Sequence, residues 1–164
     1  TKLSGKNKMG VHLSYATQSD AGDNPTSYTA SYMLAEVNAK LSGIGLAAGY
    51  EVMGSDDGVA AFKTPLATLH KFQGFADKFL GTPADGIEDV YFKVGGKAGP
   101  IKLTAIYHDF SANEGSRDLG SELDLVAAYK MNKQVSLLAK YASYDADDHA
   151  SDTDKLWLMG TFKF

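Results

Sequence analysis

Charged and histidine side chains recur at alternate positions in several stretches of this 164-residue chain. Alternate residues of a β-strand point to one face, so this spacing gathers ionisable groups on one side of a sheet. Such a face could line a water-filled channel and set its ion preference. In a closed barrel of only eight strands, the same groups would pair inside a filled interior. The candidate lining residues are Glu51, Asp89, Lys93, Lys102, His108, Glu122, Asp124, Lys130, Lys140 and Lys155.

A hydrolytic site is a second chemical possibility. His12 and Ser14 share one strand face, and an acidic residue from another strand would complete the side chains of a hydrolase that modifies lipid. The pair lies near the middle of its strand on the charged face, away from any lipid substrate. We therefore interpret it as a hydrogen-bonding pair and expect no enzyme and no catalytic residue.

A metal site is the third possibility, since residues 145–154 are rich in aspartate. An EF-hand that began at Asp145 would need Gly at its sixth position and Glu at its twelfth, where the chain has Ala150 and Leu156. The chain has no cysteine, and its histidines lack the spacing of metal ligands. We expect a solvated acidic loop, no defined metal site and no cofactor.

The elements that must position these residues are eight amphipathic strands. In each, apolar side chains alternate with polar or small ones over about 10 residues, the length that a tilted strand needs to cross a bilayer. No stretch is long and apolar enough for a membrane-spanning helix. The predicted strands cover residues 9–18, 27–38, 41–53, 88–97, 101–110, 121–131, 134–145 and 156–164.

The links between these strands alternate in length. Tight turns near Lys40, at 97–100 and at 131–134 separate longer links at 19–26, 54–87, 111–120 and 146–154, and all four prolines fall in links. Short turns on one side and long loops on the other are typical of outer-membrane barrels. The sequence thus predicts an all-β fold, an antiparallel up-and-down transmembrane β-barrel with both termini on the short-turn side.

Aromatic and apolar residues indicate contact with lipid. The last strand presents an apolar face and ends on Phe164, and it resembles the last strand of bacterial outer-membrane β-barrels. Tyrosines are predicted on the apolar faces near the long-loop side, where a membrane-interface girdle would place them. They are Tyr15, Tyr28, Tyr32, Tyr50, Tyr107 and Tyr141. The expected location is the bacterial outer membrane, with its lipid and lipopolysaccharide as partners, and the net charge of −4 argues against nucleic acid.

The 54–87 link is long enough to have a function of its own. Thr64 could cap a helix that begins at Pro65, and apolar residues then recur at helical spacing up to the Gly81–Pro83 stop. Such a partly helical loop could narrow or cap the lumen, pack against the barrel rim, or bind a partner. The residues predicted at a constriction are Thr64, Pro65, Leu69, His70, Phe72, Phe75, Asp77 and Lys78.

The same loop carries a family resemblance. Thr64-Pro65-Leu66-Ala67-Thr68-Leu69-His70, then Phe72, Gly74, Ala76-Asp77-Lys78-Phe79-Leu80, Thr82-Pro83, Gly86, Asp89 and Tyr91 resemble the alginate-export-like family of outer-membrane porins. The resemblance covers about 30 residues. It implies a barrel of well over eight strands that carries anionic or neutral solutes across the outer membrane. With eight strands, this chain would supply about half of such a barrel.

The expected function is passive diffusion of small solutes or saccharides through a porin-like channel. The alternative is a non-transporting small barrel with a structural, adhesive or lipid-binding role. Residues 1–164 are expected to form a single barrel domain. Residues 2–8 look like a strand end followed by a turn, so the domain could equally be the C-terminal part of a larger barrel. A second copy of the chain is a further candidate partner.

Overall fold

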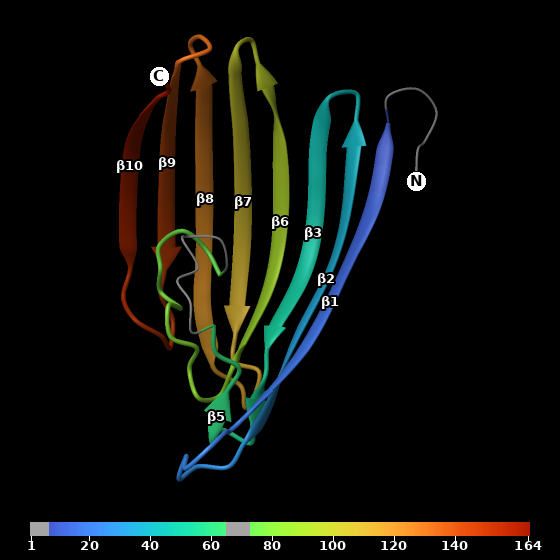
Figure 1. Ribbon diagram of the computed structural model, residues 1–164, viewed down its shortest axis with the longest axis vertical. Coiled ribbons are helices and arrows are strands. Elements are labelled where there is room, and N and C mark those ends of the chain that lie inside the picture. The colour runs from blue at the N-terminus through green and yellow to red at the C-terminus, as the bar shows by residue number, and fades with distance from the viewer. Residues whose placement is uncertain (1–6, 65–72) are drawn as a thin grey trace.

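A computed structural model describes residues 7–64 and 73–164, and it shows a single eight-stranded antiparallel sheet (Figure 1). Its strands are β1 (Lys8–Ser19), β2 (Thr29–Leu41), β3 (Ile44–Met53), β6 (Ile87–Ala98), β7 (Ile101–Ser111), β8 (Asp118–Lys130), β9 (Val135–Asp145) and β10 (Thr153–Phe162). Two short strands in the long loop, β4 (Ser55–Asp56) and β5 (Ala60–Ala61), form a separate pair. The eight main strands confirm the all-β, antiparallel prediction.

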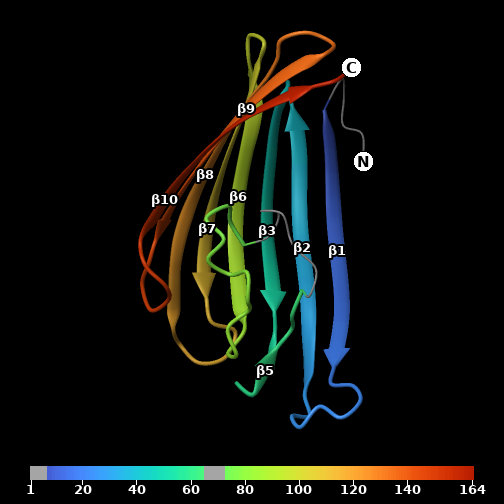
Figure 2. The ribbon, with the colours of Figure 1, turned by 60° about the vertical axis from the view of Figure 1, so that its left-hand side comes forward.

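The strands follow one another across the sheet in chain order. Tight turns join β2 to β3, β6 to β7 and β8 to β9 at one end, and the longer links lie at the other (Figure 1). The β2–β3 turn has Ser42 and Gly43 at φ 49° and 94°, the positive angles of a two-residue hairpin turn. The strands curve and twist together (Figure 2). We call the two ends the short-turn end and the long-loop end.

The expected closed barrel is not observed. Within the described residues, β1 pairs only with β2 and β10 pairs only with β9, so the sheet is open. Closure depends on whether the two edge strands can meet, and alternation within a strand carries no information about that. Both edge strands are long, and in the described part of the chain no further strand pairs with the outer edge of either.

The two faces of the sheet differ in polarity. The apolar face exposes large side chains, with Val11, Leu13, Phe92 and Leu158 between 60% and 77% exposed. The opposite face, the polar face, carries the predicted lining residues and the loop described below. No helix in the described part of the chain is long and apolar enough to span a membrane.

Strand β2 has the opposite orientation to the one predicted. The Tyr32 hydroxyl donates to Glu51 and its ring packs against Phe62, so Tyr32 belongs to the polar face. Met33 and Val37 are exposed on the apolar face instead. Tyr28 precedes the strand, which begins at Thr29. The prediction failed because both faces of β2 mix apolar and polar residues, and the two tyrosines suggested the wrong register.

The predicted helix is not seen in the described part of the long loop. Residues 73–83, which we call the inner loop, form turns and bends, and residues 65–72 lie outside the described part. Gln73, Gly74 and Asp77 have φ values of 49°, 79° and 58°. These left-handed conformations interrupt a right-handed helix. Of the apolar residues whose spacing suggested a helix, Phe75, Ala76 and Phe79 are described, and they pack against the sheet.

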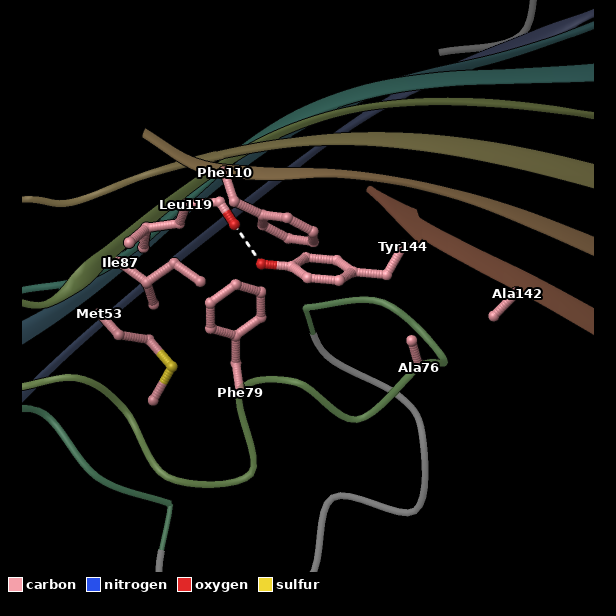
Figure 3. Packing of buried hydrophobic residues seen from close by; sticks show 8 residues of the cluster. All are labelled: Met53, Ala76, Phe79, Ile87, Phe110, Leu119, Ala142 and Tyr144. Atoms are coloured by element: carbon pink, nitrogen blue, oxygen red, sulfur yellow. Dashed lines mark hydrogen bonds between the residues drawn. The ribbon is translucent and has the colours of Figure 1, made fainter. Parts of the chain in front are cut away.

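The hydrophobic core lies between the inner loop and the polar face. Its members come from the loop and from β3, β6, β7, β8 and β9, and Phe79 points from the loop toward Phe110 and Tyr144 (Figure 3). They are Met53, Ala76, Phe79, Ile87, Phe110, Leu119, Ala142 and Tyr144. The core of this fold therefore depends on the loop, because the sheet alone has no apolar layer to cover that side.

Candidate functional site

The inner loop is bound to the polar face by two carboxylates of β8. The backbone N–H of Ala76 donates to Glu122 Oε1 at 2.7 Å, and that of Phe75 donates to Asp124 Oδ2 at 3.2 Å. Both acidic side chains are almost fully buried, at 1% and 0% exposed. The two successive N–H groups of the loop thus each donate to a separate carboxyl group. Glu122 and Asp124 thus hold the loop through its main chain.

Gly74 makes this close approach possible. A Cβ atom added at Gly74 would lie 2.4 Å from Glu122 Oε2, closer than carbon and oxygen can come without a shift. The positive φ of Gly74 is also one that other residues adopt only at a cost. Both the space and the backbone angle therefore require glycine at this position.

Lysines and a histidine hold the other side of the loop. Lys155 of β10 donates to the carbonyl oxygen of Ala76 and lies 3.3 Å from Asp77 Oδ2. Lys140 of β9 places its Nζ 4.5 Å from the centre of the Phe75 ring, a cation–π contact. His149 Nε2, in the β9–β10 loop, donates to the Lys78 carbonyl oxygen at 3.1 Å. The loop is thereby tied to strands on both sides of β9.

Phe79 is the apolar anchor of the inner loop. Its ring centre lies 4.7 Å from that of Phe110 and 6.1 Å from that of Tyr144, and it stacks on His149 at 4.8 Å. The side chain is 7% exposed. The carboxyl groups of Glu122 and Asp124 lie next to each other under the loop and interact with each other.

A polar cavity of about 290 Å³ lies beside the loop tip, over β1, β2, β3, β6 and β7. Gln73 of the loop donates to Glu51 Oε2 at 2.7 Å, which joins the loop to the cavity wall. His108 shares Nδ1 with both oxygens of Asp89, at 2.9 and 3.0 Å, and its Nε2 lies 3.8 Å from Asp124 Oδ2. Rings, carboxylates and a histidine around one cavity could bind a hydroxyl-rich or charged solute.

Tyr91 also lines the cavity, and its ring requires a glycine at the paired position of β3, Gly49. Its ring lies directly over Gly49, where an added Cβ would collide with two ring carbons and the hydroxyl oxygen of Tyr91. The hydroxyl then reaches Glu36 Oε2 at 2.8 Å. A side chain at residue 49 would push the ring and its hydrogen bond out of place.

The predicted lining residues all lie on the polar face, by side-chain contact or by register. Lys140 and Lys155 contact the inner loop as described above. The other eight divide into two groups. Glu51, Asp89, His108, Glu122 and Asp124 surround the inner loop and are buried, whereas Lys93, Lys102 and Lys130 are exposed nearer the short-turn end. Whether they line a lumen stays a prediction. His12 also borders the 290 Å³ cavity, but no hydrogen bond joins it to Ser14 within the described part.

The predicted constriction residues fall into three classes. Phe75, Asp77 and Lys78 lie on the polar face with the contacts given above. Thr64 is exposed in an irregular segment and caps no observed helix. Pro65, Leu69, His70 and Phe72 lie outside the described residues.

Sequence reasoning missed several groups of this site, chiefly Gln73, Glu36 and Tyr32. Their positions in β2 and in the loop became meaningful only when the register of β2 and the path of the loop were known. The pairing of Tyr91 with Gly49 offers one usable signal, since a glycine facing an aromatic residue on the neighbouring strand is a recognisable pattern.

We expect Gly74→Ala to weaken the docking of the inner loop. The added methyl group would collide with the Glu122 carboxylate, and the positive φ alone costs about 1–3 kcal/mol for a non-glycine residue. Urea unfolding of the protein and limited proteolysis of the loop would report the change. Gly81→Ala is the matched control, because it lies in the same loop with nothing within 4 Å of the added Cβ. Equal effects of both variants would contradict the docking geometry.

Comparisons of the chain with known proteins give no match to a family model, to a curated protein or to a solved structure. Among the described residues, no group of three or more His, Asp or Glu side chains is arranged to hold a metal ion. The function of the chain must therefore be inferred from the geometry of the polar face.

Proposed function

We propose that this chain forms part of the wall of an outer-membrane channel for passive diffusion of small solutes or saccharides. The observation that carries the proposal is the inner loop, held by Glu122, Asp124 and Phe79 on the polar face of a sheet whose other face is apolar. Selection would depend on the width left beside the loop and on the lining charge, with no covalent chemistry.

Strand length and surface polarity support the membrane location. Strands of 10 to 13 residues are long enough to cross the hydrocarbon core of a bilayer. Lipid would then cover the exposed apolar side chains. Tyr15 and Tyr107 are exposed on that face, where hydroxyls could reach headgroups or water. Lipopolysaccharide would then surround the long-loop end.

The open edges support a larger barrel. A membrane sheet must satisfy its edge hydrogen bonds, so β1 and β10 need partner strands. β1 and β10 run antiparallel to each other, as the two ends of an even-stranded segment do. Further strands of the same polypeptide would close the barrel, in keeping with the resemblance to the alginate-export-like porins, and a second copy is the other way to supply them.

A non-transporting small barrel is the second candidate. The observation in its favour is that the inner loop fills part of the polar face and is fixed there by aromatic packing. If β1 and β10 met directly, the loop and the buried carboxylates would occupy the interior of an eight-stranded barrel. The protein would then act through its loops and its lipid contacts.

Single-channel recording on the native polypeptide, purified from outer membranes and inserted in a planar bilayer, would separate the two. The channel proposal expects discrete conductance steps and an intact mass well above that of these 164 residues. Folded protein that inserts without conducting, with a mass equal to these residues, would favour the small barrel. The Gly81→Ala protein serves as a recording control, because its loop contacts should be unchanged.

A further inference from the structure

A lysine-lined hollow of about 660 Å³ opens on the polar face toward the short-turn end. Lysines of four strands line it: Lys8, Lys40, Lys93, Lys97 and Lys102. Glu36 is the one carboxylate among the described lining residues, and its oxygens already accept hydrogen bonds from Asn38 and Tyr91. Positive charge in the hollow is therefore in large excess.

Two pairs of these lysines face each other directly across strands. Lys8 pairs with Lys40 between β1 and β2, and Lys97 pairs with Lys102 between β6 and β7. Like charges in directly opposed positions destabilise a sheet. Within the described part of the chain, no carboxylate forms an ion pair with any of the four. The repulsion within these two lysine pairs is therefore not offset by a protein carboxylate. A bound anion would offset it.

Glycines make room for that anion. Gly45 and Gly95 are directly paired between the lysines, so the floor of the hollow is bare backbone. A Cβ added at Gly45 would meet nothing nearer than the carbonyl oxygen of Gly95, at 3.8 Å. Gly49 and Gly74 are required by close contacts, but Gly45 is not. The absence of a side chain at Gly45 leaves open space in the hollow.

Apart from Glu36, the carboxylates of the polar face lie too far from the two lysine pairs to neutralise them. Asp89 precedes Lys97 by eight residues on β6, which is roughly 26 Å at about 3.3 Å per residue. The Debye length is about 8 Å at physiological ionic strength. Asp89 is also occupied by His108. The buried carboxylates of the polar face thus lie under the loop with Lys140 and Lys155, whereas the two lysine pairs lie at the short-turn end.

We propose that this hollow is a binding site for small multivalent anions, that is, for solutes carrying phosphate or several carboxylate groups. Each lysine ammonium offers three donors on a flexible stem, which suits a compact multivalent anion without fixed geometry. The lysines lie on the polar face and not on the apolar face, so a dissolved anion fits the site better than a lipid headgroup. Anion binding at this site does not depend on whether the chain forms a conducting channel.

Calorimetric titration of the native protein in zwitterionic detergent, with inorganic pyrophosphate as the probe, tests the site. We expect saturable binding that weakens as salt rises, and no heat of binding with the neutral disaccharide sucrose. The double variant Lys97→Gln, Lys102→Gln should weaken binding about tenfold, as expected when charge-assisted hydrogen bonds are lost. Removing a repulsive pair should not impair folding, which circular dichroism would verify.

Two further variants make the test specific. Gly45→Leu fills the hollow and removes no charge, so it should also weaken pyrophosphate binding. Lys130→Gln with Lys133→Gln removes the same charge from the same end outside the hollow and should change affinity less than about twofold. Equal weakening by both lysine pairs would show diffuse attraction and overturn the proposal, as would unchanged binding in folded Gly45→Leu protein. Binding of the protein to phosphatidylglycerol vesicles, with no binding of pyrophosphate, would reassign the lysines to lipid.

Discussion

Phe79→Ala should release the inner loop from the sheet and lower the free energy of unfolding by about 3–5 kcal/mol, the usual range for removing a buried phenylalanine. The effect is large because Phe79 contacts Phe110, Tyr144 and His149 together. Once the anchor is lost, the buried carboxyl groups of Glu122 and Asp124 can return to water, which also favours release. If the sheet lines a pore, the single-channel conductance should rise.

Leu80→Ala is the matched control for this anchor. Leu80 is the adjacent residue of the same loop but is 67% exposed, so its truncation should change stability by less than about 0.5 kcal/mol. Urea unfolding in lipid vesicles gives the stability, and limited proteolysis between residues 73 and 83 reports release of the loop. A loop that stays protected in Phe79→Ala would mean that its polar contacts alone hold it.

The strands of this fold could be predicted because alternation is a local signal. In β6, Val90, Phe92 and Val94 alternate with charged and aromatic residues, and the strand appears where that pattern lies. The chain order across the sheet follows from the short turns. In β2, alternation alone did not identify the correct face. Tyr32 was assigned to the apolar face, although its hydroxyl donates to Glu51 on the polar face.

The candidate site was predictable only in part, because Gln73, Glu36 and Tyr32 were missed and the arrangement of the whole was not foreseen. The carboxylates and lysines were expected on one face, and the structure places them there. Their signs looked balanced in the sequence, yet Lys97 lies opposite Lys102 and far from Asp89. That separation depends on strand register. The loop path was also hidden, since Gln73, Gly74 and Asp77 adopt left-handed angles that apolar periodicity does not report.

Phe92→Arg should destabilise the protein in a bilayer by about 2–4 kcal/mol, the cost of an arginine on the lipid side of a barrel near the membrane midplane. Phe92 lies in the middle of β6, is 60% exposed, and belongs to the face that we propose to contact lipid. In water its replacement by arginine would be nearly harmless, because the ring buries little. The predicted penalty is therefore specific to a lipid environment, and unfolding from lipid vesicles measures it.

Leu138→Arg distinguishes the two faces with the same kind of change. Leu138 lies on the polar face of β9, and its direct partners Ala128 and Met159 carry no charge, so an arginine there would meet water and no opposed lysine. Its cost should stay below about 1 kcal/mol, because the polar face would be wet even within the membrane. A reversed order, with Leu138→Arg the more damaging, would mean that the face carrying the loop is the one against lipid. If both variants lowered the free energy of unfolding by equal, small amounts, the proposal that the apolar face contacts lipid would be contradicted.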